Sequence, residues 1–302
     1  MSVSESPRVL VTGSSGLIGS ALVSRLTAEG HHAVRLVRRR PVGEGAVWWD
    51  PVGGSIDAER LEGLDAAVHL AGENIASGTW TAERKRRIRE SRVAGTRLLS
   101  KTLAARTRPP EVLVCASAIG FYGDRGDEPL DEESPAGTGF LPETCVEWEA
   151  AADPARVAGI RVVHLRFGVV LSPRGGALAR MLPVFRLGLG GRLGDGRQVL
   201  SWVSLDDAVS ALMYALHAAD LAGPVNATAP NPVRNIAFTR ALGRVLRRPT
   251  VLCVPAPVLR LALGELGDTL LGGARVLPVR LLESGFTFRD PEVEGALRRM
   301  LS

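Results

Sequence analysis

Short apolar runs alternate with amphipathic stretches over the first half of the chain. Five runs predict β-strands, at residues 8–12, 33–37, 66–70, 112–116 and 161–167. Three longer stretches have the periodicity of helices, at residues 17–29, 82–105 and 141–152. Segments 9–11 and 112–114 are apolar at every position, which is typical of parallel strands covered on both faces. The pattern therefore predicts an α/β fold with a doubly wound, Rossmann-type parallel sheet.

The alternation of strand and helix fades after residue 167. A glycine-rich loop at 187–196 precedes a helix that begins near Leu205, and proline-punctuated pieces follow residue 224. Because these pieces still carry apolar residues such as Leu259 and Leu263, we interpret them as a smaller, mixed but mostly helical lobe. The predicted organisation is a Rossmann domain over residues 1–170, to which the chain returns around 199–230, and a smaller lobe over 171–302.

The composition excludes several classes of protein. The 302 residues are 45% hydrophobic and 23% charged, which is ordinary for a globular chain. No stretch approaches the roughly 18 uncharged apolar residues of a membrane span, and Met1 is followed almost directly by the first strand, without a leader. Three separated cysteines indicate a reducing compartment, and five histidines without ligand spacing indicate no metal site. We expect a soluble, cytoplasmic protein with no membrane partner.

The net charge of +5 raises the question of a nucleic-acid partner. Only Lys85 and Lys101 are lysines, so nearly all of the 37 basic residues are arginines, and they are scattered along the chain. A bias this complete is more typical of GC-rich coding than of a phosphate-binding patch. We therefore do not expect the protein to bind nucleic acid.

A glycine-rich turn follows the first predicted strand and opens the first predicted helix. Gly13 lets the chain turn tightly, Gly16 lets the backbone approach a pyrophosphate, and Gly19 lets the helix pack close to the strand. Free N–H groups at the start of such a helix face the anion. The context of strand, turn and helix makes this a dinucleotide-binding turn, and its expected members are Gly13, Ser14, Ser15, Gly16, Leu17, Ile18 and Gly19.

The end of the second predicted strand indicates which cofactor is bound. A ribose 2′-hydroxyl calls for an acidic residue about 20 positions past the fingerprint. Residues 31–43 contain no acid, and Arg38 takes that place, with Arg39 and Arg40 behind it. A guanidinium there favours a 2′-phosphate, so we expect NADP(H) rather than NAD(H), a solvated arginine loop being the alternative.

Further motifs extend the comparison along the chain. Together with the glycine turn, His69-Leu70-Ala71-Gly72 and Ala116-Ser117-Ala118 resemble the extended short-chain dehydrogenases/reductases. More narrowly, the chain is similar to the epimerase family proteins, which end in a C-terminal domain of unknown function. The segments that carry this resemblance are 70–76, 119–124, 148–151, 165–171, 188–191, 201–203, 226–232 and 285–288.

The resemblance implies an active site between an NADP-binding Rossmann domain and a substrate-binding lobe. It places Ser117 as the catalytic serine that hydrogen-bonds the reacting carbonyl or hydroxyl. It implies further cofactor contacts at Arg38, Arg39, Leu70, Ala71, Gly72, Phe167 and Gly168. Substrate contacts would come from Glu73, Asn74, Gly190, Gly191 and Trp202, although loop capping for Glu73 and Asn74 and a core position for Trp202 remain equally open.

The chain departs from the superfamily at its acid/base pair. The superfamily uses Tyr-x-x-x-Lys, in which the lysine lowers the pKa of the phenol. Here the aligned positions are Leu141 and Cys145, which supply neither group. Tyr122 follows Ser117 in a predicted loop and is our candidate proton donor, with a role in shaping the pocket as its alternative. Glu143 and Glu147 are alternative bases. We give less weight to Cys145 as a nucleophile and set aside a hydrolase triad of Ser117, His164 and Asp206 because no Gly-x-Ser-x-Gly elbow exists.

Two functions follow. The first is an NADP(H)-dependent oxidoreductase or epimerase that transfers hydride to or from a small molecule bearing a hydroxyl or carbonyl, with a sugar nucleotide as one candidate substrate. The second is a non-catalytic NADP(H)-binding redox sensor or division-related regulator, by analogy with relatives. The resemblance is also compatible with a homodimer formed through helices such as 82–105.

Overall fold

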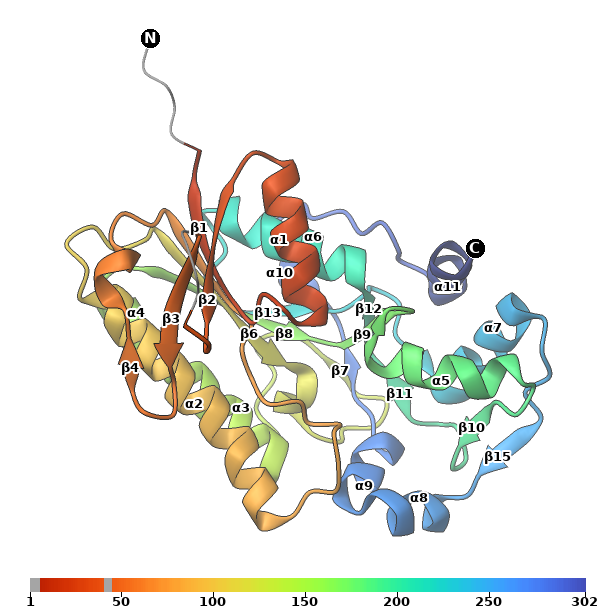
Figure 1. Ribbon diagram of the computed structural model, residues 1–302. Coiled ribbons are helices and arrows are strands. Elements are labelled where there is room, and N and C mark those ends of the chain that lie inside the picture. Colours follow the sequence, from red (N-terminus) through yellow and green to blue (C-terminus); the bar gives the residue numbers. More distant parts are fainter. Residues whose placement is uncertain (1–5, 41–44) are drawn as a thin grey trace.

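A large parallel sheet runs through the molecule (Figure 1), and the predicted Rossmann-type α/β fold is confirmed. Its strand order is β13-β8-β6-β5-β1-β2-β3-β4, and every described neighbour is parallel except the short β4. The computed structural model describes residues 6–40 and 45–302. The strands are β1 (Arg8–Thr12), β2 (His32–Val37), β3 (Ala46–Asp50), β4 (Ser55–Ile56), β5 (Ala66–His69), β6 (Val112–Ala118), β8 (Arg161–Phe167) and β13 (Gly223–Ala227).

Helices cover both faces of this sheet, as consecutive apolar positions require. Val11 packs on the side of α1 (Leu17–Ala28) and α6 (Leu205–His217), and its neighbour Leu10 packs on the side of α2 (Ala82–Ala104). Both side chains are fully buried. The second face is completed by α3 (Phe140–Ala150), α4 (Asp153–Val157) and the 3-10 turn η1 (Ala58–Leu61).

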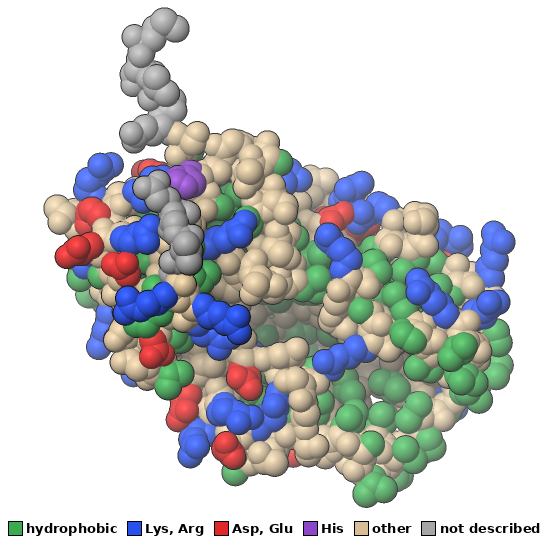
Figure 2. Space-filling model, in the orientation of Figure 1, with side chains coloured by type: hydrophobic (Ala, Val, Ile, Leu, Met, Phe, Trp, Pro, Cys, Tyr) green, Lys and Arg blue, Asp and Glu red, His purple; other side chains and the backbone are tan. Residues whose placement is uncertain are grey.

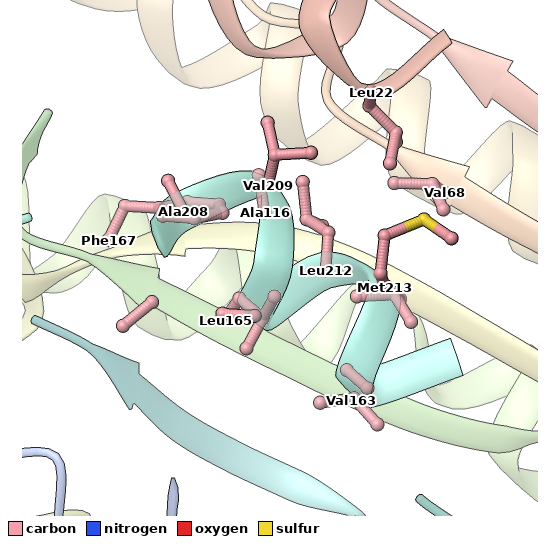
Figure 3. Packing of buried hydrophobic residues seen from close by; sticks show 14 of the residues in the cluster. Leu22, Val68, Ala116, Val163, Leu165, Phe167, Ala208, Val209, Leu212 and Met213 are labelled. Atoms are coloured by element: carbon pink, nitrogen blue, oxygen red, sulfur yellow. The ribbon is translucent and has the colours of Figure 1, made fainter. Parts of the chain in front are cut away.

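Helix α6 supplies the centre of the first core. Figure 3 shows Met213 of α6 beside Val68 on β5 and below Leu22 on α1, and Val163 and Leu165 of β8 belong to the same cluster. The same cluster takes in α1 and β5. The C-terminal part of the chain also reaches it, because α10 (Val279–Glu283) lies beside β13 and places a buried leucine there.

The remaining elements form a smaller lobe. Its core gathers Leu178, Leu182, Trp202, Phe238 and Leu297 around α5 (Gly176–Arg186), α7 (Asn235–Leu246) and α11 (Val293–Leu301). Short strand pairs border it: β9 (Val169–Ser172) with β12 (Trp202–Ser204), β10 (Gly191–Leu193) with β15 (Leu252–Val254), and β11 (Val199–Leu200) with β14 (Val233–Arg234). The other described elements are β7 (Pro129–Leu130), β16 (Arg275–Val276), α8 (Ala256–Leu263), α9 (Glu265–Leu271) and the 3-10 turn η2 (Ile119–Tyr122).

The structure corrects several details of the prediction. Strand β6 continues to Ala118, so Ser117 lies within a strand rather than after it. The segment 187–196 contains β10 and is not wholly a loop. The strands β3 and β13 were not predicted, and the smaller lobe combines helices with short strand pairs, as its mixed, mostly helical prediction requires. The division at residue 170 stays a prediction, with the addition that 279–288 also packs on the large sheet.

No described helix has the length and apolar character needed to cross a bilayer. Within residues 6–40 and 45–302, no group of three His, Cys, Asp or Glu side chains is placed to hold a metal ion.

The core around α6 generates a stability prediction. Leu212 is fully buried, so Leu212→Ala removes apolar burial and leaves a cavity, and we expect the free energy of unfolding to fall by about 3 kcal/mol. Val52 is almost fully exposed, at 96%, and Val52→Ala should change stability by less than about 0.5 kcal/mol. Urea unfolding of the two variants measures the difference. Equal losses of stability in the two variants would contradict the burial of Leu212 in this core.

Candidate functional site

The candidate site lies where the parallel strands of the sheet end. Register pairs Thr12 with Leu36 and with His69, and Ser117 with Arg166, so the carboxyl ends of β1, β2, β5, β6 and β8 meet at one edge. Ligands of open α/β sheets bind at this edge. Figure 2 shows that this part of the molecule is hollowed, near the start of α1 and the junction with the smaller lobe.

The glycine turn is built so that no side chain fits at two of its positions. Gly13 has φ +64°, and a Cβ there would lie 2.8 Å from the carbonyl of Leu70. A Cβ on Gly19 would lie 2.2 Å from the carbonyl oxygen of Gly13, far inside contact distance. These glycines therefore hold β1, the turn and α1 together more tightly than any other residue type would allow.

Helix α1 begins at this turn with its backbone amides free for a ligand. Gly16 is the N-cap, no side chain caps the helix, and its first turn carries no acidic residue. Gly16 and Ser15 are exposed, and Gly16 donates to the carbonyl of Gly13 at 2.9 Å. The helix dipole and the uncapped N–H groups make this a favourable place for a phosphate. Leu17 contacts the turn between β9 and α5, which joins the two parts of the chain here.

Thr12 ties the glycine turn to the segment that follows β5. Its hydroxyl accepts from the backbone N–H groups of Leu70 and Ala71, each at 3.0 Å, and lies 2.8 Å from His69 Nδ1. Because the hydroxyl already accepts twice, its own proton goes to Nδ1, and the imidazole carries its proton on Nε2. Complete burial lowers the pKa of His69 to about 4, so the ring is neutral. Sequence reasoning did not single out His69 as an anchor.

Arg38 and Arg39 stand immediately beyond the end of β2. Both are exposed, and the carbonyl of Arg38 accepts a hydrogen bond from Trp48 Nε1 at 3.1 Å. Arg40 packs its guanidinium 4.6 Å from the Trp48 ring centroid. Within the described part of the chain, neither Arg38 nor Arg39 forms an ion pair. Their guanidinium groups are therefore available at the edge where strands end, although Pro41 to Glu44 lie outside the described residues.

Ser117 belongs to a buried polar network. Its hydroxyl donates to Glu149 Oε1 at 2.6 Å, and Arg166 binds both oxygens of that carboxylate through Nε and Nη2, each at 2.8 Å. The Arg166 guanidinium also packs 3.4 Å from the ring centroid of Phe121. Two-point binding by Arg166 fixes the direction of the Glu149 carboxylate and therefore the position of the Ser117 proton.

Tyr122 lies at the inner end of this network. Its side chain is fully buried, its hydroxyl donates to Asn226 Oδ1 at 2.8 Å, and it accepts from Arg166 Nη1 at 3.0 Å. Burial raises the pKa of Tyr122 in spite of the nearby guanidinium. The predicted loop position of Tyr122 is wrong, because this residue ends a 3-10 turn. Its hydroxyl is directed into the protein. Its role as a proton donor stays a prediction that this geometry does not favour.

Helix α3 places Leu141 and Cys145 against the turn that follows Ser117. A Cβ on Gly120 would lie 3.4 Å from Leu141 Cβ and 4.0 Å from Cys145 Sγ. Burial raises the pKa of the Cys145 thiol to about 12, so no thiolate forms there. Glu143 is exposed, and Glu147 pairs with Arg89 on the surface. The buried thiol of Cys145 gives little support to a role as nucleophile. The surface positions of Glu143 and Glu147 give little support to either residue as a base.

Glu73 and Asn74, the candidate substrate residues after β5, already contact neighbouring protein groups. Asn74 Oδ1 accepts from the backbone N–H of Ala76 at 2.9 Å, and the Glu73 carboxylate lies 4.0 Å from Arg84 and 3.8 Å from Arg87. This hydrogen bond agrees with the interpretation of Asn74 as a loop-capping residue. Glu73 is one-third exposed and remains a candidate for contact with a ligand.

The candidate substrate residues in the smaller lobe pack closely against other parts of the protein. Trp202 is fully buried, and its Nε1 donates to the carbonyl of Asn231 at 3.2 Å, so it is a core residue and cannot touch a substrate in this arrangement. A Cβ on Gly190 would lie 2.5 Å from the Phe185 ring, and one on Gly191 would lie 2.1 Å from the carbonyl oxygen of Leu252. Close packing of β10 explains both glycines, and substrate contact there stays a prediction.

The remaining candidate cofactor contacts, Phe167, Gly168 and Gly72, lie beside the edge formed by the carboxyl ends of the strands. Phe167 is buried at the end of β8, and a Cβ on Gly168 would lie 2.7 Å from the carbonyl oxygen of Ser201. Gly72 faces Arg92, whose guanidinium stacks 5.1 Å from the Trp148 ring centroid.

Ser117, His164 and Asp206 are not arranged as a hydrolase triad. His164 has a buried Nδ1 without a hydrogen-bond partner within the described chain. Asp206 pairs instead with Arg289 and Arg299.

Sequence reasoning missed Glu149 and Arg166 as members of the site. Glu149 lies four residues after Cys145 on the helix, hence on the same face, and Arg166 lies opposite Ser117 on the neighbouring strand. Arg166, between Leu165 and Phe167 in a mostly apolar strand, was the available signal, because a buried arginine requires an acidic partner.

Comparisons with known proteins cover nearly the whole chain. Residues 9–227 match the NAD dependent epimerase/dehydratase family, and residues 254–300 match a domain of unknown function, DUF1731. An epimerase family protein of Mycobacterium bovis is 47% identical over 290 residues, which is 96% of each chain.

Solved structures agree with this similarity. The human epimerase family protein SDR39U1, crystallised with NADPH, is 34% identical, with a TM-score of 0.88 over 97% of this chain and 98% of that one. A nucleoside-diphosphate sugar epimerase of Corynebacterium glutamicum is 37% identical, with a TM-score of 0.81 over 98% of this chain and 58% of that one.

The buried ion pair generates a second prediction. Glu149→Gln leaves the Arg166 charge buried without a counter-ion, and we expect a loss of about 3–5 kcal/mol in the free energy of unfolding. Glu147→Gln on the same helix removes an exposed pair and should cost less than about 1 kcal/mol. Chemical denaturation separates the two. A similar, small effect of both variants would show that the Arg166 site is solvated.

The neutral imidazole of His69 generates a pH prediction. The pKa of about 4 in the folded protein lies below the ordinary histidine value of 6.5, so the unfolded chain binds a proton in that interval and the folded chain does not. Stability should therefore fall as the pH falls, by about 2 kcal/mol between pH 7 and pH 5.

The control for this prediction is the variant His69→Leu. Urea unfolding at both pH values should show a smaller pH dependence in the variant than in the wild type, because other groups, such as His164, titrate in both. An unchanged pH dependence would exclude His69 as its source.

Proposed function

Because this chain belongs to the NAD dependent epimerase/dehydratase family, we propose that it binds NADP(H) and transfers hydride between that cofactor and a substrate that bears a hydroxyl or carbonyl. The observation that carries the proposal is the uncapped start of α1 at the glycine turn, with two arginines beyond β2 at the same sheet edge. A sugar nucleotide is one candidate substrate.

The residues at this edge fit the cofactor. Gly13, Gly16 and Gly19 leave room for the backbone to approach a pyrophosphate, and the amides of Leu17 and Ile18 open α1 without a competing cap. Ser14 and Ser15 lie in the turn, while Leu70, Ala71 and Gly72 form the opposite side, held by Thr12. Phe167 and Gly168 close the end near Ser117.

Arg38 would select the phosphorylated form of the cofactor. Its exposed guanidinium follows β2, where the ribose of a bound dinucleotide is expected, and Arg39 is beside it. The human relative crystallised with NADPH supports this choice. A charge-assisted hydrogen bond to a 2′-phosphate contributes roughly 1.5–3 kcal/mol, which would distinguish NADPH from NADH.

Ser117 and Glu149 would handle the substrate proton. NADP(H) supplies the hydride donor or acceptor when bound, so the protein has to position the substrate oxygen and move one proton. Ser117 is in hydrogen-bond contact with Glu149, and Arg166 orients that carboxylate. We infer a path from the substrate oxygen through the Ser117 hydroxyl to Glu149, in place of the Tyr-x-x-x-Lys pair. Arg166 is a positioning residue in this path.

A second candidate function is NADP(H) binding without turnover. The observations that favour it are the inward direction of the Tyr122 hydroxyl and the apolar contacts at Leu141 and Cys145. Such a protein would report the redox state of its cofactor to a partner. Oxidation of NADPH on mixing with sugar nucleotides or small carbonyls distinguishes the functions, since a catalytic protein should lose this activity in Ser117→Ala and keep it in Cys253→Ser.

Cofactor binding is the prediction to test first. Calorimetric titration should show NADPH binding at least tenfold tighter than NADH binding, and Arg38→Ala should remove most of that preference because the 2′-phosphate loses its counter-ion. Arg108→Ala, at an exposed site beyond the opposite end of the sheet strands, is the matched control and should bind like wild type. Failure of a folded, cofactor-free sample to bind either nucleotide would overturn the proposal.

A further inference from the structure

Two neighbouring segments of the smaller lobe carry ten arginines and no acidic residue. They are residues 173–194 and 233–264. The pairing of β10 with β15 brings them together, and Arg248 Nε donates to the carbonyl of Arg186 at 2.8 Å. Arg234, Arg244 and Arg260 pair with acidic residues from other segments, so the excess positive charge comes from the remaining arginines, among them Arg186, Arg247 and Arg248.

The same surface exposes aliphatic side chains. Leu187 is 75% exposed in the turn after α5, and Val251 is 82% exposed in the turn before β15. These turns are in contact, since Gly188 faces Pro249. We call this surface the arginine–aliphatic face, and its members are Val184, Arg186, Leu187, Leu189, Arg247, Arg248, Val251 and Leu252. In Figure 2 the lower right of the molecule, over β15 and α8, is mostly hydrophobic with arginines at its margin.

The arginines of this face are free of acidic partners. Among the described residues, Arg186, Arg247 and Arg248 form no ion pair, whereas Arg244 at the edge of the face pairs with Glu294. A hollow of about 340 Å³ lies beside them, lined by Arg240, Gly243, Arg244, Arg247, Arg248, Pro249 and Thr250. The four arginines that line this hollow are exposed, and such a lining favours an anionic group such as a phosphate.

These features select among the possible partners. A second copy meeting this face across a two-fold axis would bring arginines against arginines, which disfavours a symmetric dimer here. Aliphatic tips of two adjacent turns, bordered by arginines, are instead suited to the headgroup region of a bilayer, where apolar side chains insert and cations meet lipid phosphates.

We propose that the arginine–aliphatic face docks the protein on membranes that contain anionic lipid. This contact is peripheral, so it requires no spanning helix, and it modifies the expectation of no membrane partner. It also does not depend on the proposed cofactor chemistry. Docking through the smaller lobe would leave the glycine turn and Arg38 on the other part of the molecule, free to bind a nucleotide.

Vesicle co-sedimentation of the full-length protein tests the proposal. We expect binding to phosphatidylcholine vesicles that contain phosphatidylglycerol, little binding to phosphatidylcholine alone, and weakening by salt. Arg247→Gln with Arg248→Gln should lower the partition coefficient roughly thirtyfold. Leu187→Gln with Val251→Gln should lower it several-fold while keeping the salt dependence, because the inserted aliphatic groups are lost.

Matched controls are available on the other part of the molecule. Arg60→Gln with Arg108→Gln removes two exposed arginines, and Val52→Gln with Val157→Gln alters two exposed valines. Both controls should bind vesicles like wild type, and thermal unfolding checks that every variant folds. Absence of binding to phosphatidylglycerol vesicles, or equal losses in the controls, would overturn the proposal. So would displacement by inorganic phosphate beyond the effect of matched ionic strength, which would assign the hollow to a soluble phosphate.

Discussion

The ion pair between Arg166 and Glu149 connects the candidate site to the rest of the fold. Arg166 comes from β8 and Glu149 from α3, and the pair is held between Ser117 on β6 and Tyr122 at the end of η2. Through Tyr122 the network reaches Asn226 on β13, whose amide donates to the carbonyl of Leu277. The buried Arg166 guanidinium is hydrogen-bonded by Glu149 and Tyr122, while Ser117 and Asn226 bond to those two partners, so the charge depends on segments that are far apart in the sequence.

Much of the sheet and the glycine turn could be predicted from the sequence because their signals are local. The strand 161–167 was placed at its observed limits, and the Gly13 to Gly19 turn has the conformation that its spacing indicates. Strand β13 was missed because Gly223, Pro224 and Asn226 interrupt its apolar pattern, and the residues with which it pairs lie 60 positions earlier in the chain. The tryptophans of β3 likewise gave no alternation that sets a short strand apart from a loop.

The polar network of the candidate site was harder to predict for a related reason. A hydroxyl such as that of Tyr122 can face a ligand or the interior, and its position five residues after Ser117 does not decide between them. What decides is the presence of Arg166 and Asn226, which come from distant parts of the chain. Likewise, Trp202 and the glycines of β10 lie in segments associated with substrate binding, yet each is explained by packing inside the smaller lobe.

The direction of the hydrogen bond from Ser117 to Glu149 has a consequence for what the site recognises. Because Arg166 binds both oxygens of the Glu149 carboxylate, the single proton of Ser117 is committed to that carboxylate, and the serine oxygen presents lone pairs to any bound molecule. An alcohol can donate to that oxygen, whereas a ketone or aldehyde cannot. The direction of one buried hydrogen bond would therefore favour the alcohol over the carbonyl member of an alcohol–carbonyl pair as the ligand.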